Sequence, residues 1–85
     1  MTVIEFLTRD NCPLCDEAAM MLDEWAPRLG FETTTLDVDT DPELQSKYGG
    51  RVPVARSPDG KVLVEGRWSR RMLLARLLRY RLSGD

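Results

Sequence analysis

The sequence contains no histidine and only two cysteines among its 85 residues. Without histidine, no imidazole can serve as a general base or as a metal ligand. A tetrahedral zinc site takes four nitrogen or sulfur ligands, so two cysteines cannot complete one within a single chain. Thiol chemistry in this chain must therefore rely on a cysteine whose pKa is lowered by its surroundings.

Long apolar runs and extremes of charge are also missing. The first residues, Met1–Glu5, contain no basic segment followed by an apolar one, so we expect neither a signal peptide nor a membrane span and predict a cytoplasmic protein. The chain is 42% hydrophobic and 31% charged, which is typical of a folded domain. Its 85 residues suffice for one small core, so residues 1–85 are predicted to form a single domain.

Basic residues concentrate near the end of the chain. Residues 66–85 carry six arginines and one aspartate, whereas residues 1–65 carry six basic and thirteen acidic side chains. A basic segment can bind nucleic acid or an acidic partner, but no aromatic–basic platform for stacking bases accompanies it. We expect a solvated helix that complements an acidic body, in a monomer with neither a nucleic-acid nor a membrane partner.

Hydrophobic periodicity predicts a strand, a helix and a second strand near the start of the chain. The apolar run 3–7 favours a buried strand, and the β-branched segment 31–38 favours another strand parallel to it. Between them, apolar residues recur at helical spacing while acidic residues occupy the other side. The apolar positions of this helix are Cys15, Ala18, Ala19, Leu22 and Trp25. The three elements form a βαβ unit.

A short helix and a β-hairpin are predicted next. The helix begins within residues 40–43 and ends by Tyr48, before two glycines that offer a left-handed termination. Segments 52–56 and 61–65 flank a Ser-Pro-Asp-Gly turn, in which proline and glycine take their preferred places. These two segments are therefore expected to pair as antiparallel strands.

The last predicted element is a helix capped by Ser69 and running to about Leu82. Its apolar stripe consists of Leu73, Leu74, Leu77 and Leu78. The resulting order is β-α-β-α-β-β-α. A parallel pair followed by a hairpin predicts an α/β fold with a mixed four-stranded sheet and helices on both faces.

Glu5 interrupts the first predicted strand. An unpaired buried carboxylate is costly, so either its face of the strand is partly wet or a basic side chain pairs with it. We expect the wet face.

The two cysteines lie in the motif Cys12-Pro13-Leu14-Cys15 at the start of the first helix. Residues three apart within a helix have Cβ atoms about 5 to 6 Å apart, whereas a disulfide requires roughly 3.5 to 4.5 Å. Cys12 is therefore expected at the helix cap, where its sulfur can accept from the amides of Leu14 and Cys15. Pro13 has no amide to offer but fixes the turn. A dithiol in this context predicts redox chemistry, with Cys12 as the attacking thiolate and Cys15 as the resolving thiol.

Arg9, three residues before Cys12, is placed to add a positive charge beside that thiolate. Asp10, Asp16 and Glu17 act in the opposite sense. Exposed charges are screened by water and salt, so we expect the helix cap to dominate and Arg9 to tune the thiolate.

Residues 7–18, Leu-Thr-Arg-Asp-Asn-Cys-Pro-Leu-Cys-Asp-Glu-Ala, resemble the active-site segment of the small glutaredoxin-like proteins of the thioredoxin superfamily. Residues 48–54, Tyr-Gly-Gly-Arg-Val-Pro-Val, resemble their second signature. The resemblance implies a thioredoxin/glutaredoxin fold. It also implies that Pro53 is cis and faces the dithiol, and that the backbone of Val52 pairs with an extended substrate.

The resemblance is weaker where glutaredoxins hold glutathione. Glutaredoxins proper carry a paired glycine and acidic residues around the last helix, whereas this chain has Gly-Arg-Trp-Ser-Arg-Arg over 66–71. No cofactor is expected, and these residues do not support glutathione as the thiol reductant. Arg51, Arg67 and Arg70 could instead serve another anionic or protein partner.

Three hypotheses follow for the function. The favoured one is thiol–disulfide exchange on a protein or low-molecular-weight disulfide, with electrons from a reductase or a thiol reductant. The second is a module that binds a metal ion or an iron–sulfur cluster through the same cysteines, completed by a dimer or an external thiol. The third is a redox-inactive thioredoxin-fold domain that docks partners through its basic last helix.

Overall fold

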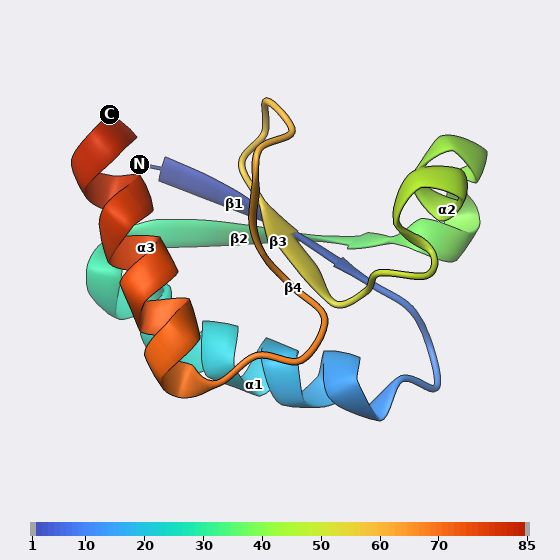
Figure 1. Cartoon of the computed structure of the whole chain (residues 1–85), viewed down its shortest axis with the longest axis horizontal. Coiled ribbons are helices and arrows are strands. Elements are labelled where there is room, and N and C mark those ends of the chain that lie inside the picture. Colours follow the sequence, from blue (N-terminus) through green and yellow to red (C-terminus); the bar gives the residue numbers. More distant parts are fainter. Residues whose placement is uncertain (1, 85) are drawn as a thin grey trace.

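The computed structural model describes residues 2–84, which form a four-stranded sheet with helices on both faces (Figure 1). The elements are β1 (Thr2–Thr8), α1 (Pro13–Trp25), β2 (Phe31–Asp37), α2 (Pro42–Tyr48), β3 (Val54–Arg56), β4 (Val62–Glu65) and α3 (Arg70–Gly84). Short 3₁₀ turns, η1 (Pro27–Leu29) and η2 (Val38–Thr40), follow α1 and β2. The predicted order of elements is confirmed.

The sheet is mixed, with strand order β2-β1-β3-β4. Strand β2 runs parallel to β1, which places Phe6 opposite Thr35, whereas β3 pairs antiparallel with β1 and places Ala55 opposite Phe6. The β3–β4 hairpin completes the sheet on the other side. Strand β1 is therefore central, and the loop that leaves it leads directly to the dithiol.

Alternation along β1 divides the core between the two faces of the sheet. Ile4 and Phe6 face α1 and α3, where they pack in one cluster with Leu22, Leu73 and Leu77. Leu7, the next residue along, faces the other way and packs with residues of η2, α2 and β3, namely Val38, Tyr48 and Val54. Each fully buried leucine of this kind stabilises the fold by roughly 1.5 to 3 kcal/mol.

Two details of the helices differ from the predictions. Gly49 ends α2 in the right-handed region, with φ −53°, so the expected left-handed termination is wrong. Glycine is suited to this position for a different reason, because a Cβ on Gly49 would collide with the carbonyl oxygen of Gln45. In α3 only part of the apolar stripe is buried: Leu73 and Leu77 are covered, whereas Leu78 is 41% exposed.

The arginines of α3 compensate the acidic body only in part. Within residues 2–84, Arg70 is the one side chain of this helix with a carboxylate partner, Glu24, at 3.6 Å. Arg76 donates instead to the carbonyl of Leu63. None of the helices described over residues 2–84 is long and apolar enough to cross a membrane.

Glu5 has a basic partner, so the expectation of a wet face is wrong. Arg56 lies opposite Glu5 in the β1–β3 pair, and its Nε donates to the carboxylate at 2.8 Å. Both side chains are about four-fifths covered. The same guanidinium donates to the Tyr48 hydroxyl at 3.3 Å and lies over its ring. Arg56 thus links Glu5 of β1 to Tyr48 of α2.

Replacing Arg56 should therefore destabilise the fold. In Arg56→Met the carboxylate of Glu5 remains partly buried without its partner, and we expect the free energy of unfolding to fall by about 1.5 to 3 kcal/mol. Glu5→Gln/Arg56→Met should lose less than the sum of the two single variants, because the variants remove the same pair. Urea unfolding of all four proteins measures this coupling, with Arg71→Met as the control for an exposed arginine. Additive losses would show that the pair contributes nothing.

Candidate active site

Cys12 occupies the N-cap of α1. Its backbone is extended (φ −127°, ψ 96°), and its sulfur accepts a hydrogen bond from the amide of Cys15 at 3.1 Å. Its carbonyl accepts the first bond of the helix, from Asp16, at 3.0 Å. Pro13 follows as the first helical residue, where its missing amide costs nothing. The cap prediction is confirmed for the Cys15 amide; within residues 2–84 no bond from Leu14 accompanies it.

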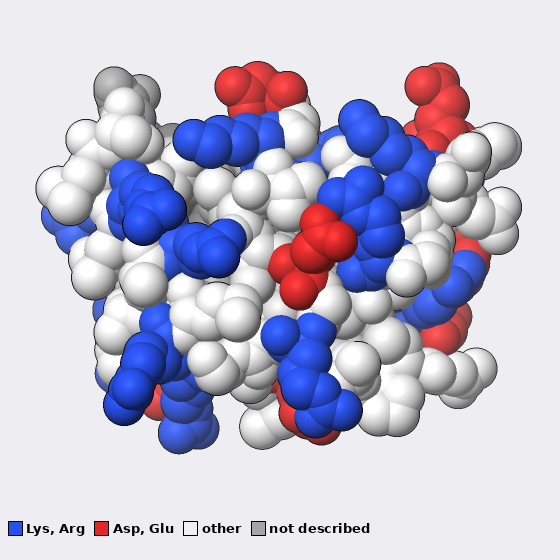
Figure 2. Space-filling model, in the orientation of Figure 1, with Lys and Arg blue, Asp and Glu red and all other residues white. Residues whose placement is uncertain are grey.

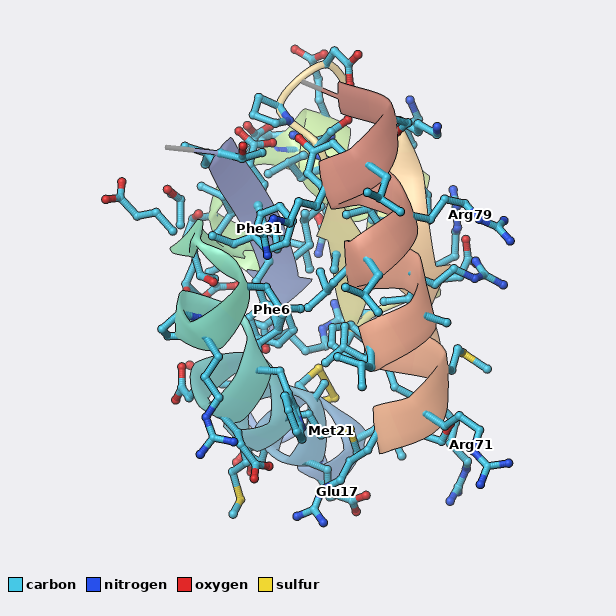
Figure 3. The ribbon with its side chains drawn as sticks, turned by 90° about the vertical axis from the view of Figure 1, so that its left-hand side faces the viewer. Phe6, Glu17, Met21, Phe31, Arg71 and Arg79 are labelled. Carbon is cyan, nitrogen blue, oxygen red and sulfur yellow. A yellow bond between two sulfur atoms is a disulfide. The ribbon has the colours of Figure 1, made fainter. Side chains whose placement is uncertain are left out.

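The two sulfur atoms are joined in a disulfide (Figure 3), with the Cα atoms 5.1 Å apart. The two ends of this bond differ in accessibility: Cys15 is 1% exposed, whereas Cys12 is only half-buried. Asn11, which precedes the cap, has φ +56°, a left-handed conformation that asparagine tolerates better than most residues. The chain thus turns sharply from β1 into the helix and presents Cys12 ahead of Cys15.

The peptide bond between Val52 and Pro53 is cis, as the resemblance implies. The carbonyl of Pro53 accepts from the amide of Gly66 at 2.9 Å and from the indole nitrogen of Trp68 at 3.2 Å. The amide of Val52 donates to the Tyr48 carbonyl at 3.1 Å, so only its carbonyl can pair with an extended substrate. That Pro53 faces the dithiol and that Val52 aligns substrate remain predictions.

Arg9 directly follows β1 and is held by Asp39 of η2 and by Gly49 at the end of α2. Its guanidinium donates to both oxygens of Asp39, at 2.6 and 3.2 Å, and to the Gly49 carbonyl at 2.9 Å. The Arg9 hydrogen bond is the main reason why the pKa of Asp39 lies below its ordinary value, and the pair raises the pKa of Arg9 in turn. Because Asp39 offsets much of its charge, the tuning of Cys12 by Arg9 remains a prediction.

Arg51 also has a carboxylate partner. Its guanidinium donates to both oxygens of Glu65, at 2.6 and 3.1 Å, and lies over the ring of Tyr48, 5.0 Å from the centroid. These bonds lower the pKa of Glu65. Burial alone would raise the pKa of Tyr48, but hydrogen bonds and charge from Arg56 and Lys47 outweigh it and lower that pKa. A substrate that used Arg51 would compete with Glu65.

A cavity of about 350 Å³ opens between α1 and the strands β1 and β2 and reaches Cys15. Its lining is mostly polar, and besides Cys15 it consists of Phe6, Thr8, Arg9, Asp10, Asn11, Asp16, Ala19, Leu22, Asp23, Thr33 and Thr35. Cys15 is therefore bordered by a largely polar cavity on this side. Within the described residues, no three His, Cys, Asp or Glu side chains are grouped so as to hold a metal ion.

Sequence reasoning missed two supporting residues, Trp68 and Asp39. Trp68 links Pro53 to the core, since its ring packs edge-on against Phe6 with centroids 5.8 Å apart. Nothing in the local pattern pairs Trp68 with Pro53, fifteen residues away in sequence. In the sequence, Asp39 is one of several acidic residues that follow the second strand. It lies next to Arg9 because β1 and β2 are parallel and end together, at Thr8 and Asp37.

The fold and the dithiol at the start of α1 define a protein of the thioredoxin superfamily. The family model of the glutaredoxin-like domain (DUF836) matches residues 3–78, and the chain belongs to this family. The predicted resemblance is thereby confirmed, and the chain is a glutaredoxin-like domain with its two cysteines in a Cys-x-x-Cys arrangement.

The chain is also similar to several individual proteins. The uncharacterized proteins Mb0520 of Mycobacterium bovis and Rv0508 of Mycobacterium tuberculosis are each 38% identical over 69 residues, which cover 75% of this chain. The chain spans 64% of the length of these curated relatives. Protein XcR50 of X. campestris has a similar crystal structure, with 34% identity, a TM-score of 0.75 and coverage of 89% of this chain and 96% of its own.

More distant structures share the fold alone. Thioredoxin 1 of Thermosipho africanus aligns with a TM-score of 0.69 at 17% identity, over 92% of each chain. Protein Ne2328 of Nitrosomonas europaea aligns with a TM-score of 0.71 at 24% identity, over 87% of this chain and 88% of its own.

The Arg9–Asp39 pair predicts a pH-dependent stability. Because the pKa of Asp39 is lowered in the folded chain, the pair stabilises the fold above the ordinary carboxyl pKa of about 3.9 and loses this effect as the pH falls through the lower folded value. Asp39→Asn should therefore melt at a lower temperature than the wild type at pH 7, by a small margin because the pair is exposed.

Circular dichroism melts between pH 7 and pH 3 measure this difference. The melting temperatures of the wild type and Asp39→Asn should converge as the pH falls below about 4. Glu32→Gln, which removes an exposed carboxylate from β2, is the control for loss of one negative charge. A difference that widened on acidification would contradict the assigned direction of the Asp39 shift.

Proposed function

We propose that this domain is a thiol–disulfide oxidoreductase that cycles between the Cys12–Cys15 disulfide and two free thiols. The observation that carries the proposal is the asymmetry of the pair. The Cys12 sulfur lies at the positive end of α1 and accepts from the Cys15 amide, whereas the Cys15 sulfur is buried. Helix N-termini lower the pKa of cysteines, and a lowered pKa is what makes a thiol reactive near neutral pH.

The reaction proceeds in two exchange steps. In the reduced domain the Cys12 thiolate attacks one sulfur of a substrate disulfide, forming a mixed disulfide and releasing the other substrate sulfur as a thiolate. Cys15 then loses its proton and attacks the Cys12 sulfur. The bond between Cys12 and the substrate breaks, the second substrate thiol leaves, and the Cys12–Cys15 disulfide forms. Two electrons pass to the substrate, and an external dithiol or two thiols restore the reduced state.

The substrate would be a protein or low-molecular-weight disulfide. The Val52 carbonyl could accept a hydrogen bond from an extended substrate, and Pro53 is fixed by the bonds from Gly66 and Trp68. We propose that Arg51 helps to bind an anionic substrate. We also propose that the domain acts as a monomer in the cytoplasm. The segment 66–71 supplies no acidic group to hold the glutathione amine, which favours a reductase over glutathione as the electron source.

The other two hypotheses remain distinguishable. A metal or iron–sulfur module would need ligands from a second chain or an external thiol, since this sequence has only two cysteines and no histidine. It requires a stoichiometric metal that is lost when both cysteines are replaced. A redox-inactive docking domain would bind its partner equally well after replacement of Cys12 and Cys15.

The roles of the two cysteines predict different defects. Cys12→Ser should abolish disulfide reduction, because no thiolate remains at the helix cap. Cys15→Ser should still attack the substrate but stop at the mixed disulfide, which mass spectrometry detects as an adduct on Cys12. The assay is reduction of insulin disulfides by the purified domain, with electrons supplied either by a thioredoxin reductase or by glutathione. We expect the glutathione-driven rate to be the lower.

A redox titration supplies the second test. The domain should equilibrate between dithiol and disulfide at a potential in the range of thioredoxins and glutaredoxins, about −270 to −200 mV. Wild-type rates in Cys12→Ser would overturn the assignment of the nucleophile. A pair that stayed oxidised under both electron sources would overturn the proposed cycle.

A further inference from the structure

Three basic side chains converge between the last helix and the hairpin. Lys61 and the α3 residues Arg76 and Arg79 line a pocket of about 210 Å³, together with Val62, Leu63 and Tyr80. We call this the α3–β4 pocket. Figure 2 shows basic side chains gathered along the α3 side of this face, and Figure 3 shows Arg79 projecting outward from α3.

The charges of this pocket are not neutralised by the fold. The ion pairs found within residues 2–84 involve Arg9, Arg51, Arg56 and Arg70. The three pocket cations thus have no carboxylate within 4 Å among the described side chains. Asp59 approaches Lys61, but its carboxylate accepts from Ser57 Oγ and the Lys61 amide, and the Lys61 charge is the smallest of the effects that lower its pKa. Neighbouring positive charges repel one another, and a bound anion would offset this repulsion.

The pocket is also preorganised. Arg76 is fixed by a bond of 2.8 Å from Nη1 to the carbonyl of Leu63, which leaves other guanidinium donors for a ligand. Tyr80 is fixed from two sides, since its ring stacks on Phe31 at 5.5 Å and its hydroxyl donates to the carbonyl of Val3 at 3.3 Å. Planar guanidinium groups match carboxylate oxygens in pairs, so a carboxylate could meet Arg76 without a rearrangement of Arg76 or Tyr80.

We infer that the α3–β4 pocket binds a carboxylate side chain from an acidic segment of a protein partner. The volume favours a single side chain, because pockets for small-molecule ligands are typically about 300 to 1,000 Å³. Beyond the pocket, α3 exposes the apolar side chains Met72, Leu78 and Leu82, which suit contact with a protein surface. This site involves neither Cys12 nor Cys15, so the inference does not rest on the proposed redox function.

Nucleic acid fits the same surface less well. Single-stranded nucleic acids bind largely by stacking bases on aromatic rings. Tyr80, the aromatic residue of the pocket, is already stacked on Phe31.

The test uses the whole chain and an acidic probe. The probe is a fluorescein-labelled octapeptide of alternating glutamate and glycine, with an alternating lysine–glycine octapeptide as its opposite. Titration of the ¹⁵N-labelled protein with the acidic peptide should shift amides of residues 61–63 and 76–80 in a saturable way. Fluorescence anisotropy should show weaker binding as salt rises, because the contacts are exposed charges.

A charge-matched pair of variants isolates the pocket. Lys61→Gln/Arg79→Gln removes two exposed cations whose side chains make no hydrogen bond within the described residues, and it should weaken binding about tenfold. Arg28→Gln/Lys47→Gln removes the same charge from η1 and α2 and should change the affinity less than twofold. If the first variant does not fold, the amide map of the unaltered chain decides the matter.

Three outcomes would overturn the inference. Equal losses in the two double variants would show a general effect of net charge. Amide shifts confined to residues outside the α3–β4 pocket would place the acidic peptide elsewhere. Tighter binding of an eight-residue oligothymidylate or of inorganic phosphate at the same amides would identify the pocket as a phosphate site.

Discussion

The hydrogen bond from the Trp68 indole to the Pro53 carbonyl joins the core of this domain to its candidate site. The indole is 6% exposed and packs edge-on against Phe6 of the central strand. The Gly66 amide donates to the same carbonyl, so the segment between β4 and α3 is hydrogen-bonded to the segment between α2 and β3. The two contacts of Trp68 therefore link Pro53 to the packing of the central strand β1.

The dithiol depends on a second constraint, the amphipathic packing of α1. Cys15, Ala18 and Leu22 lie on the buried face of that helix, each 1% exposed. Burial of this stripe fixes where the helix begins, and the N-cap then falls on Cys12. The apolar periodicity that holds the helix on the sheet therefore also determines which cysteine is accessible and which amide supports its sulfur.

How far the sequence determines these features varies with the range of the interaction. Element order, the cap at Cys12 and the hairpin follow from signals within a few residues, and they are confirmed. The partners of Glu5, Arg9 and Arg51 lie 51, 30 and 14 residues away, and strand register decides which acids and bases meet. Gly49 could not be interpreted from sequence for a similar reason. A glycine can be required by a left-handed backbone or by a close contact with its missing Cβ, and only the structure of α2 shows that the close contact applies here.

Because the domain has no histidine, few of its groups change charge near neutral pH. Carboxylates, guanidinium groups and ammonium groups keep their charge across the neutral range, so between about pH 5 and 8 only a thiol and the α-amino group can titrate. The salt-linked pairs around the site then act as a constant background. Among the side chains, a change of reactivity with pH in that range would come from the thiols of Cys12 and Cys15, and the Cys12 sulfur has the N-terminus of α1 and the Cys15 amide as its stabilising partners.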